Sequence, residues 1–139
     1  MAQALPAYLE ASRLAMRRRS FSLAPTCMRK AAYIHRIQGH YASAVALLTR
    51  AVGVDRRRNR RGLADDYSLL STVHYSMGAY SRADRLARRD LSLHTSLHDL
   101  EGRADDLMHL ANVNRMMGAN ACHTVESSGS PPKSRTATS

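Results

Sequence analysis

The chain has 139 residues and a formal net charge of +10, with 21 Lys and Arg residues against 11 Asp and Glu residues. One Phe and no Trp, beside abundant Ala, Leu and Arg, suit packed helices and poorly suit a sheet. The sequence contains no apolar run that could span a bilayer and no secretory signal at its start. Cys27 and Cys122 lack metal-site spacing, so we expect reduced thiols in a cytoplasmic protein.

In chain order, residues 1–22 predict the second helix of an incomplete repeat. Residues 23–58 and 59–98 each predict a helical hairpin, with an apolar stretch, a break at glycine and a second helix that carries small residues. Residues 99–118 predict an unpaired first helix, and the polar residues 119–139 predict a disordered tail. Two interpretations fit these ends: an array with degenerate ends, or a fragment or truncated product of a longer repeat protein.

These boundaries rest on an internal repeat of about 40 residues, which indicates a solenoid of stacked units rather than one globular core. The positions of residues 62–80 that recur one period later, in residues 102–120, are Gly62, Ala64, Asp65, Asp66, Leu70, Val73, Met77 and Gly78. A weaker third copy aligns Gly39-His40-Tyr41 with Gly78-Ala79-Tyr80. The first segment obeys the same spacing, because Ala4, Tyr8 and Ala11 lie one period before Ala44, Leu48 and Ala51.

The motifs around the two glycines resemble a tetratricopeptide repeat. Gly39-x-Tyr41-x-x-Ala44-x-x-x-Leu48-x-x-Ala51 is similar to the turn and second helix of that family, and so is Gly78-x-Tyr80-x-x-Ala83-x-x-x-Ala87. The small residues Ala32, Ser71 and Ala111 fit the first helix, whereas His35, His74 and Asn114 stand where an aromatic residue is usual. The period resembles the longer form in Pins-like cell-polarity adaptors and kinesin light chains. Over about residues 2–118, the resemblance implies an all-α, right-handed superhelical solenoid of helical hairpins.

The resemblance also implies where a partner would bind. Members of the family usually hold a peptide on a concave face lined by the first helix of each unit. Transferred by position, the side chains on this face are Arg29, Tyr33, Arg36, Asp65, Ser68, Thr72, Tyr75, Asp105, Met108, Asn112 and Arg115. Polar groups with some Tyr and Met can hold an extended or helical peptide. The carboxylate clamp of chaperone-binding members is absent, because Arg29, Tyr33, Leu69 and Asp105 occupy its places.

Arginines form a second candidate surface. They cluster at residues 17–19, at residues 56–61 and at residues 82–89, and the first two clusters are separated by one period, so a regular solenoid would stack them along one edge. One interpretation is solvated helix ends, whose cations complement the helix dipole. The other is a basic edge that attracts an acidic peptide, an anionic membrane or RNA; its residues are Arg56, Arg57, Arg58, Arg60 and Arg61. Since no aromatic set is interleaved with the arginines, readout of RNA bases is not expected.

Histidines give no clear metal signal. His94 and His98 lie four residues apart on a predicted helix, with Asp90 four residues before His94. No further ligand at helical spacing completes a site, so we interpret both histidines as solvent-exposed and predict no metal. His35 and His74 occupy equivalent repeat positions, which predicts packing between helices.

Enzymatic chemistry is not expected either. The acidic pairs at residues 65–66 and 105–106 recur in each unit, which indicates helix starts, where the dipole stabilises acids. We find no nucleophile–base pair, phosphate-binding loop or dinucleotide fingerprint, and therefore predict no cofactor.

The sequence thus predicts a protein–protein interaction scaffold or adaptor that binds a partner segment, with an acidic segment favoured by the arginines. Two alternatives remain open. The chain could bind RNA or an anionic membrane through the basic edge, or be a truncated product without independent function whose uncapped ends favour self-association.

Overall fold

The computed structural model describes residues 3–128, and the side chains up to residue 119. This part of the chain consists of six α-helices and contains no strand: α1 (Ala4–Arg17), α2 (Leu23–Ile37), α3 (Tyr41–Asp55), α4 (Arg60–Ser76), α5 (Tyr80–Ser96) and α6 (Leu100–Ser128). The all-helical prediction is therefore confirmed. None of these helices combines the length and the apolar character needed to cross a membrane.

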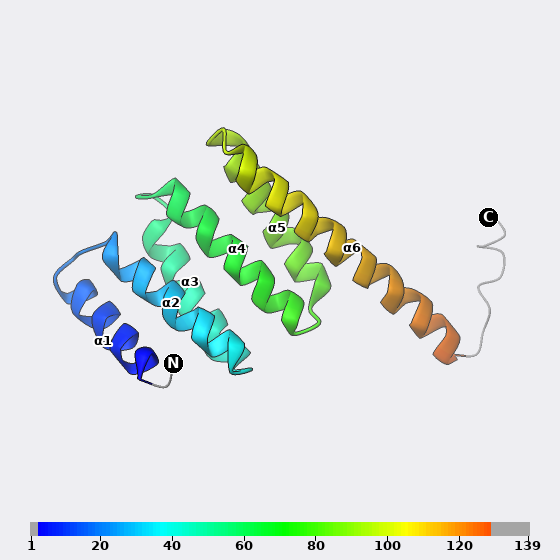
Figure 1. Ribbon diagram of the computed structural model, residues 1–139, viewed down its shortest axis with the longest axis horizontal. Helices are drawn as coiled ribbons and strands as arrows, with labels where there is room; N and C mark the ends of the chain where they lie inside the picture. Colours follow the sequence, from blue (N-terminus) through cyan, green and yellow to red (C-terminus); the bar gives the residue numbers. More distant parts are fainter. Residues whose placement is uncertain (1–2, 129–139) are drawn as a thin grey trace.

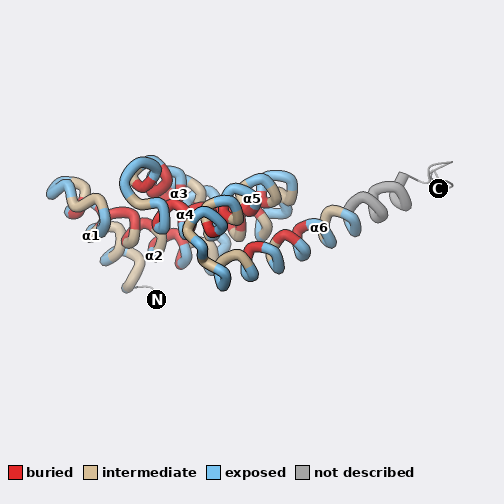
Figure 2. Tube along the Cα trace, turned by 90° about the horizontal axis from the view of Figure 1, so that it is seen from above, coloured by how far each residue is buried: buried red, intermediate tan, exposed pale blue. Residues whose placement is uncertain are grey.

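The helices follow a simple order in space. Each contacts the next in the sequence, and α2 also contacts α4. We call α2, α4 and α6 the first helices and α1, α3 and α5 the second helices. In Figure 1 the first helices succeed one another across the molecule, with α3 and α5 behind them. Figure 2 shows that the buried residues lie where these two layers meet.

Two glycines end the first helices of the two hairpins. Gly39 and Gly78 both have φ of +82°, the left-handed conformation that glycine adopts without steric cost. The amide of the next residue then reaches back to the helix, and both bonds, His40 N to His35 O and Ala79 N to His74 O, measure 2.8 Å. The breaks predicted at these glycines are confirmed.

The end of α6 differs from its prediction. We expected helix to stop at Gly118, but α6 runs on to Ser128, so residues 119–128 of the predicted disordered tail are helical. Gly118 is not among the glycines with positive φ. Glycine permits a left-handed turn without enforcing one, and the ten residues that follow contain neither Gly nor Pro. Residues 129–139 lie outside the described part of the chain.

Small side chains let the helices approach closely in the core. Alanines on four helices, including Ala31, Ala44, Ala64 and Ala83, are completely buried, and the larger side chains Leu48 and Val73 fill the space between them. Val73 is one of the positions that recur in residues 102–120. Met77, another of these positions, is 44% exposed because it stands at the C-cap of α4, beyond the packed turns.

Leu48→Ala should test this packing. Leu48 is fully buried, so truncation leaves a cavity and should lower the free energy of unfolding by about 2–5 kcal/mol. Leu14→Ala is the matched control, because Leu14 is 48% exposed and its truncation should change stability by less than about 1 kcal/mol. Urea denaturation of both variants measures the difference. Equal effects would contradict the packing described here.

Candidate functional site

The face of the first helices begins at α2 with an exposed aromatic side chain. Tyr33 is 46% exposed, and the Arg36 guanidinium carbon lies 5.3 Å from its ring centroid, a cation–π contact. Beside them an open cavity of about 500 Å³ lies between α1 and α2, and Tyr8 and Lys30 help to line it. This end of the face therefore combines the Tyr33 ring, the cationic side chains of Arg36 and Lys30, and an open cavity.

The middle of the face, on α4, is more polar. Ser68 is exposed, and the half-buried Thr72 donates its hydroxyl hydrogen to the Ser68 carbonyl over 3.0 Å. Tyr75 is also half-buried, and its ring makes edge contacts with Tyr80 at 5.5 Å and His109 at 5.6 Å between centroids. Tyr75 thus joins α4 to α5 and α6 while keeping part of its surface in solvent.

The far end of the face, on α6, is the most open. Met108 is 62% exposed, and Asn112 and Arg115 are exposed one and two turns further along the helix. Leu107 is 54% exposed as well, although no motif had singled it out. Sequence periodicity missed Leu107 because its exposure depends on which neighbours α6 has.

Arg29, which the resemblance placed on this face, makes its contacts inside the chain. Its guanidinium donates to Asp66 Oδ1 at 2.7 Å and to Asp55 Oδ2 at 3.1 Å, and it also reaches the Gly62 carbonyl at 3.3 Å. The side chains of Asp55 and Asp66 are completely buried, and that of Arg29 is 17% exposed. We call Arg29, Asp55 and Asp66 the first junction. They tie α2 to α3 and α4.

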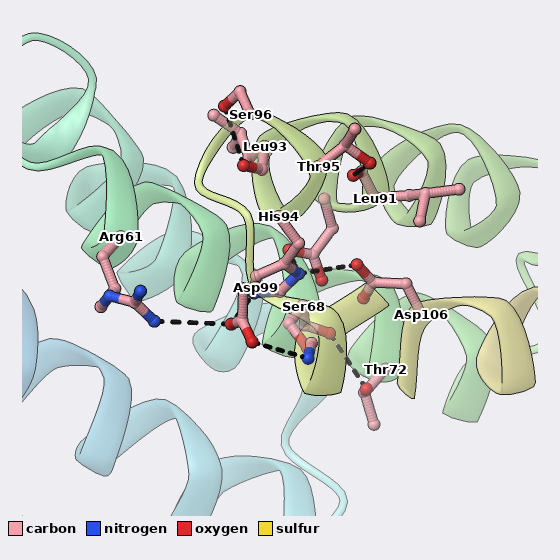
Figure 3. A network of polar contacts seen from close by, with 12 residues as sticks. Arg61, Ser68, Thr72, Leu91, Leu93, His94, Thr95, Ser96, Asp99 and Asp106 are labelled. Atoms are coloured by element: carbon pink, nitrogen blue, oxygen red, sulfur yellow. Dashed lines mark hydrogen bonds and ion pairs between the residues drawn. The ribbon is translucent and has the colours of Figure 1, made fainter. Parts of the chain in front are cut away.

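A related cluster joins α5 and α6. Asp90 and His94 come from α5 and Asp106 comes from α6, and all three are buried. His94 Nδ1 lies 2.7 Å from Asp106 Oδ2 and 3.2 Å from Asp90 Oδ1. We call these three residues the second junction. Figure 3 shows His94 between Asp106 on one side and Asp99 on the other.

The two junctions correct two predictions. His94 is not solvent-exposed, since only 7% of its surface is accessible, whereas His98 is exposed as expected. The acidic pairs do not start helices, because α4 begins at Arg60 and α6 at Leu100, and Asp66 and Asp106 face the junctions instead. The residues that do cap these helices are Asn59 and Asp99, which accept from the Gly62 and Gly102 amides at 3.0 Å. The expected packing of His74 is confirmed, as it is 6% exposed.

Burial dominates the electrostatics of both junctions. Burial, followed by the neighbouring Asp55, raises the pKa of Asp66 to about 8 although Arg29 acts in the opposite direction. At the second junction, burial and the nearby Asp106 carboxylate raise the pKa of Asp90 to about 9. In both places two buried carboxyl groups lie close together, so a shared proton relieves their repulsion.

The basic edge lies where second helices connect to first helices. The Arg58 guanidinium carbon sits 4.2 Å from the ring centroid of Phe21, which brings the α3–α4 connection next to the α1–α2 connection. Arg60 donates to the Ser96 hydroxyl at 2.9 Å, and Arg61 pairs with Asp99 at 3.4 Å, next to the α5–α6 connection. The three connections share one edge (Figure 1). Three arginines of the basic edge thus have contacts within the chain, while Arg56 and Arg57 are exposed.

Comparisons with known proteins leave these surfaces without a family assignment: a scan against protein-family models and a search of curated protein sequences returned no match.

Arg29→Met should be strongly destabilising. The substitution keeps an unbranched side chain but leaves the buried carboxylates of Asp55 and Asp66 without their cation, which typically costs about 3–5 kcal/mol of unfolding free energy. Arg13→Met is the control, because Arg13 pairs with Glu10 on the surface and its loss should cost at most about 1 kcal/mol. Denaturation of the two variants by urea measures both values. Similar small losses would mean that Arg29 does not hold the junction.

The pKa of Asp66 predicts a pH dependence of stability. Between its ordinary value of 3.8 and about 8, the folded chain keeps a proton that the unfolded chain has released. Stability should therefore fall as pH rises through this window and level off above it. Asp66→Asn removes this titration. The slope of unfolding free energy against pH should therefore be shallower in the variant than in the unchanged chain, and the two slopes should differ by up to about 1.4 kcal/mol per pH unit.

Urea midpoints measured from about pH 5 to pH 9 test this prediction. Some slope should remain in Asp66→Asn, because Asp90 acts in the same direction. Parallel curves for the variant and the unchanged chain would contradict the assignment to Asp66.

Proposed function

We propose that the chain is a tetratricopeptide-like solenoid of helical hairpins, right-handed in its superhelix, and that it acts as a protein–protein interaction scaffold. One observation carries the proposal: α2, α4 and α6 follow one another on the same side of the molecule (Figure 1). Side chains that the structure exposes along them include Tyr33, Ser68 and Met108. A partner segment crossing the three helices would contact each in turn.

The chemistry of this face suits a peptide. Tyr and Arg are the side chains that most often dominate binding energy at protein interfaces, and Tyr33 and Arg36 form such a pair beside an open cavity. Ser68 and Asn112 offer polar groups for hydrogen bonds, and Met108 adapts its flexible thioether to irregular apolar surfaces. These properties support an extended or helical ligand held by a mixture of polar and apolar contacts.

Charge favours an acidic partner. Arg36 and Arg115 stand on the first and last helices of the face, in a chain whose formal net charge is +10. Asp65 and Asp105, in contrast, are exposed between them, so the attraction acts at the two ends of the face. Such a field speeds the approach of acidic segments and weakens as salt rises. Because Arg29 is bonded within the first junction, we expect it to position the face rather than to bind the partner.

A selection from a displayed peptide library on the full chain tests the proposal. Affinities of selected peptides, measured by fluorescence anisotropy, should fall at least about tenfold in a Tyr33→Ala, Arg36→Ala double variant. The matched control is Arg56→Glu, Arg57→Glu, which changes two exposed residues of the basic edge and should leave affinity within about threefold at moderate salt. Circular dichroism checks that both variants stay helical.

Two outcomes would overturn the proposal. If the control loses binding and the face variant keeps it, the basic edge is the binding surface, and titrations with single-stranded RNA and with anionic vesicles then distinguish those ligands by their steep salt dependence. If no peptide is selected, the chain has no independent peptide-binding activity.

A further inference from the structure

The second junction brings together the donor set of a metal site. Asp90, His94 and Asp106 each offer one ligand atom, and these atoms lie within 4.8 Å of one another. Two of them, on α5, are one helical turn apart, and the third arrives from α6, 12 residues beyond His94. Sequence spacing does not predict this set, because spacing along one helix does not show which side chain an adjacent helix supplies.

One oxygen at the junction lacks a partner. Asp90 is 1% exposed, and its Oδ1 atom makes no hydrogen bond although it points to His94 Nδ1 over 3.2 Å. A buried carboxylate oxygen without a hydrogen bond is unfavourable, and at this junction the proton shared with Asp106 offsets that cost. A cation bound between Asp90 and His94 would give this oxygen a ligand bond.

A carboxylate also lies behind the His94 ring, at a distance longer than a hydrogen bond. The Nε2 atom of the ring faces Asp99 Oδ2 at 3.7 Å, and Asp99 is itself held by the Gly102 amide and by Arg61 (Figure 3). A carboxylate behind the ring commonly fixes the tautomer and orientation of a ligating imidazole. Gly102 packs so tightly that a Cβ atom there would lie 2.6 Å from His94 Cδ2, which restricts the ring further.

The junction opens to solvent through an acidic cavity of about 230 Å³. Asp65, Glu101 and Asp105 line this cavity together with Asp99 and Asp106. With Asp90, six of the 11 acidic residues of a strongly basic chain gather here. The local field therefore attracts cations, and the cavity provides an entry path and space for a water ligand.

Compared with the first junction, the second lacks an arginine side chain between its buried carboxyl groups. In the repeat alignment that pairs Gly39 with Gly78, Ser68 is equivalent to Arg29, and His94 is equivalent to Asp55. In the first junction the Arg29 guanidinium supplies positive charge between two buried carboxylates. In the second, serine replaces that arginine, while a further buried carboxylate, Asp90, is added.

We propose that the second junction binds a divalent transition-metal ion, Zn²⁺ above all, through Asp90 Oδ1, His94 Nδ1 and Asp106 Oδ2. Imidazole nitrogen beside carboxylate oxygen suits Zn²⁺, whereas Mg²⁺ and Ca²⁺ prefer sites of oxygen alone. Tetrahedral bonds of about 2.0 Å place ligand atoms about 3.3 Å apart. The Asp90–His94 distance of 3.2 Å already matches, and the 2.7 Å between His94 and Asp106 must widen by roughly 0.6 Å. Binding displaces to solvent both the proton on His94 Nδ1 and the proton that Asp90 and Asp106 share, because metal ligands must be deprotonated.

Titration calorimetry of ZnSO₄ into the full chain tests the proposal, in a Cys122→Ser background that removes a competing thiol. One equivalent of Zn²⁺ should bind and raise the midpoint of thermal unfolding, and Co²⁺ at the same site should show visible d–d absorption. Asp90→Asn keeps the shape of the side chain and removes a ligand, so binding should weaken at least about tenfold. His98→Gln is the matched control, because His98 is an exposed histidine four residues away and should leave binding unchanged.

A second variant keeps the test decisive if Asp90→Asn unfolds. Ser68→Arg places at the second junction an arginine equivalent to Arg29 of the first. This cation should take the place of the metal ion, so the Zn²⁺-dependent rise in unfolding temperature should disappear, while the unfolding midpoint of the metal-free chain should not fall. Failure to bind one equivalent, or binding that neither Asp90→Asn nor Ser68→Arg alters, would overturn the proposal. These readouts measure Zn²⁺ binding and stability rather than peptide binding, so the proposal can fail while the proposed function holds; because Ser68 also belongs to the face, peptide affinity is compared only in the Asp90→Asn and His98→Gln variants.

Discussion

Buried charge at the hairpin junctions constrains how the helices of this protein can pack. The carboxylates of Asp55 and Asp66 are completely removed from solvent, and the Arg29 guanidinium, donated by a third helix, lies between them. An unpaired buried charge is far more costly than a lost surface ion pair. The three helices are therefore restricted to positions in which all three groups meet. Apolar packing alone would tolerate small sliding movements that this contact does not.

The second junction also buries carboxyl groups between helices, but different side chains surround them. Gly62 and Gly102 occupy equivalent positions, and each lies close against a cap residue and a junction side chain. At the first junction the nearby side chain is Asp55, and at the second it is His94, so an imidazole stands in the place of a carboxylate. This exchange, together with the added Asp90, leaves two buried carboxylates around one imidazole. The two junctions thus share a backbone arrangement around Gly62 and Gly102, while the charged groups on it differ.

The parts of the fold that depend on the local preferences of single residues could be predicted from the sequence. Glycine adopts left-handed backbone conformation without strain, so Gly39 and Gly78 mark turns that the sequence reveals directly. Gly118 shows the limit of this reasoning, because the same residue lies within a continuing helix when no turn is built there. Helix boundaries follow from local preferences, and the junctions do not. The contact between His94 and Asp106 depends on how α5 crosses α6, which no local pattern encodes.

The candidate binding face was predictable only by position. Tyr33, Ser68 and Met108 are exposed on the helices to which the repeat assigned them, whereas Arg29, placed on the same face, reaches into the first junction. A long arginine side chain can extend from the edge of a face to a buried acid, so the position of its backbone does not decide which surface it serves. The direction of such side chains had to come from the structure.

The first helices carry both the face and the junctions, and Ser68 of the face also lines the acidic cavity of the second junction, so the two are coupled. On α4, Asp66 meets Arg29 inside the protein while Ser68 stands exposed half a turn away. On α6, Asp106 reaches the second junction and Met108 faces solvent. If a metal ion fixes α6 against α5, a partner that needs α4 and α6 in that relation has less ordering to complete when it binds. By thermodynamic reciprocity, the same partner would then tighten the binding of the metal ion by an equal factor.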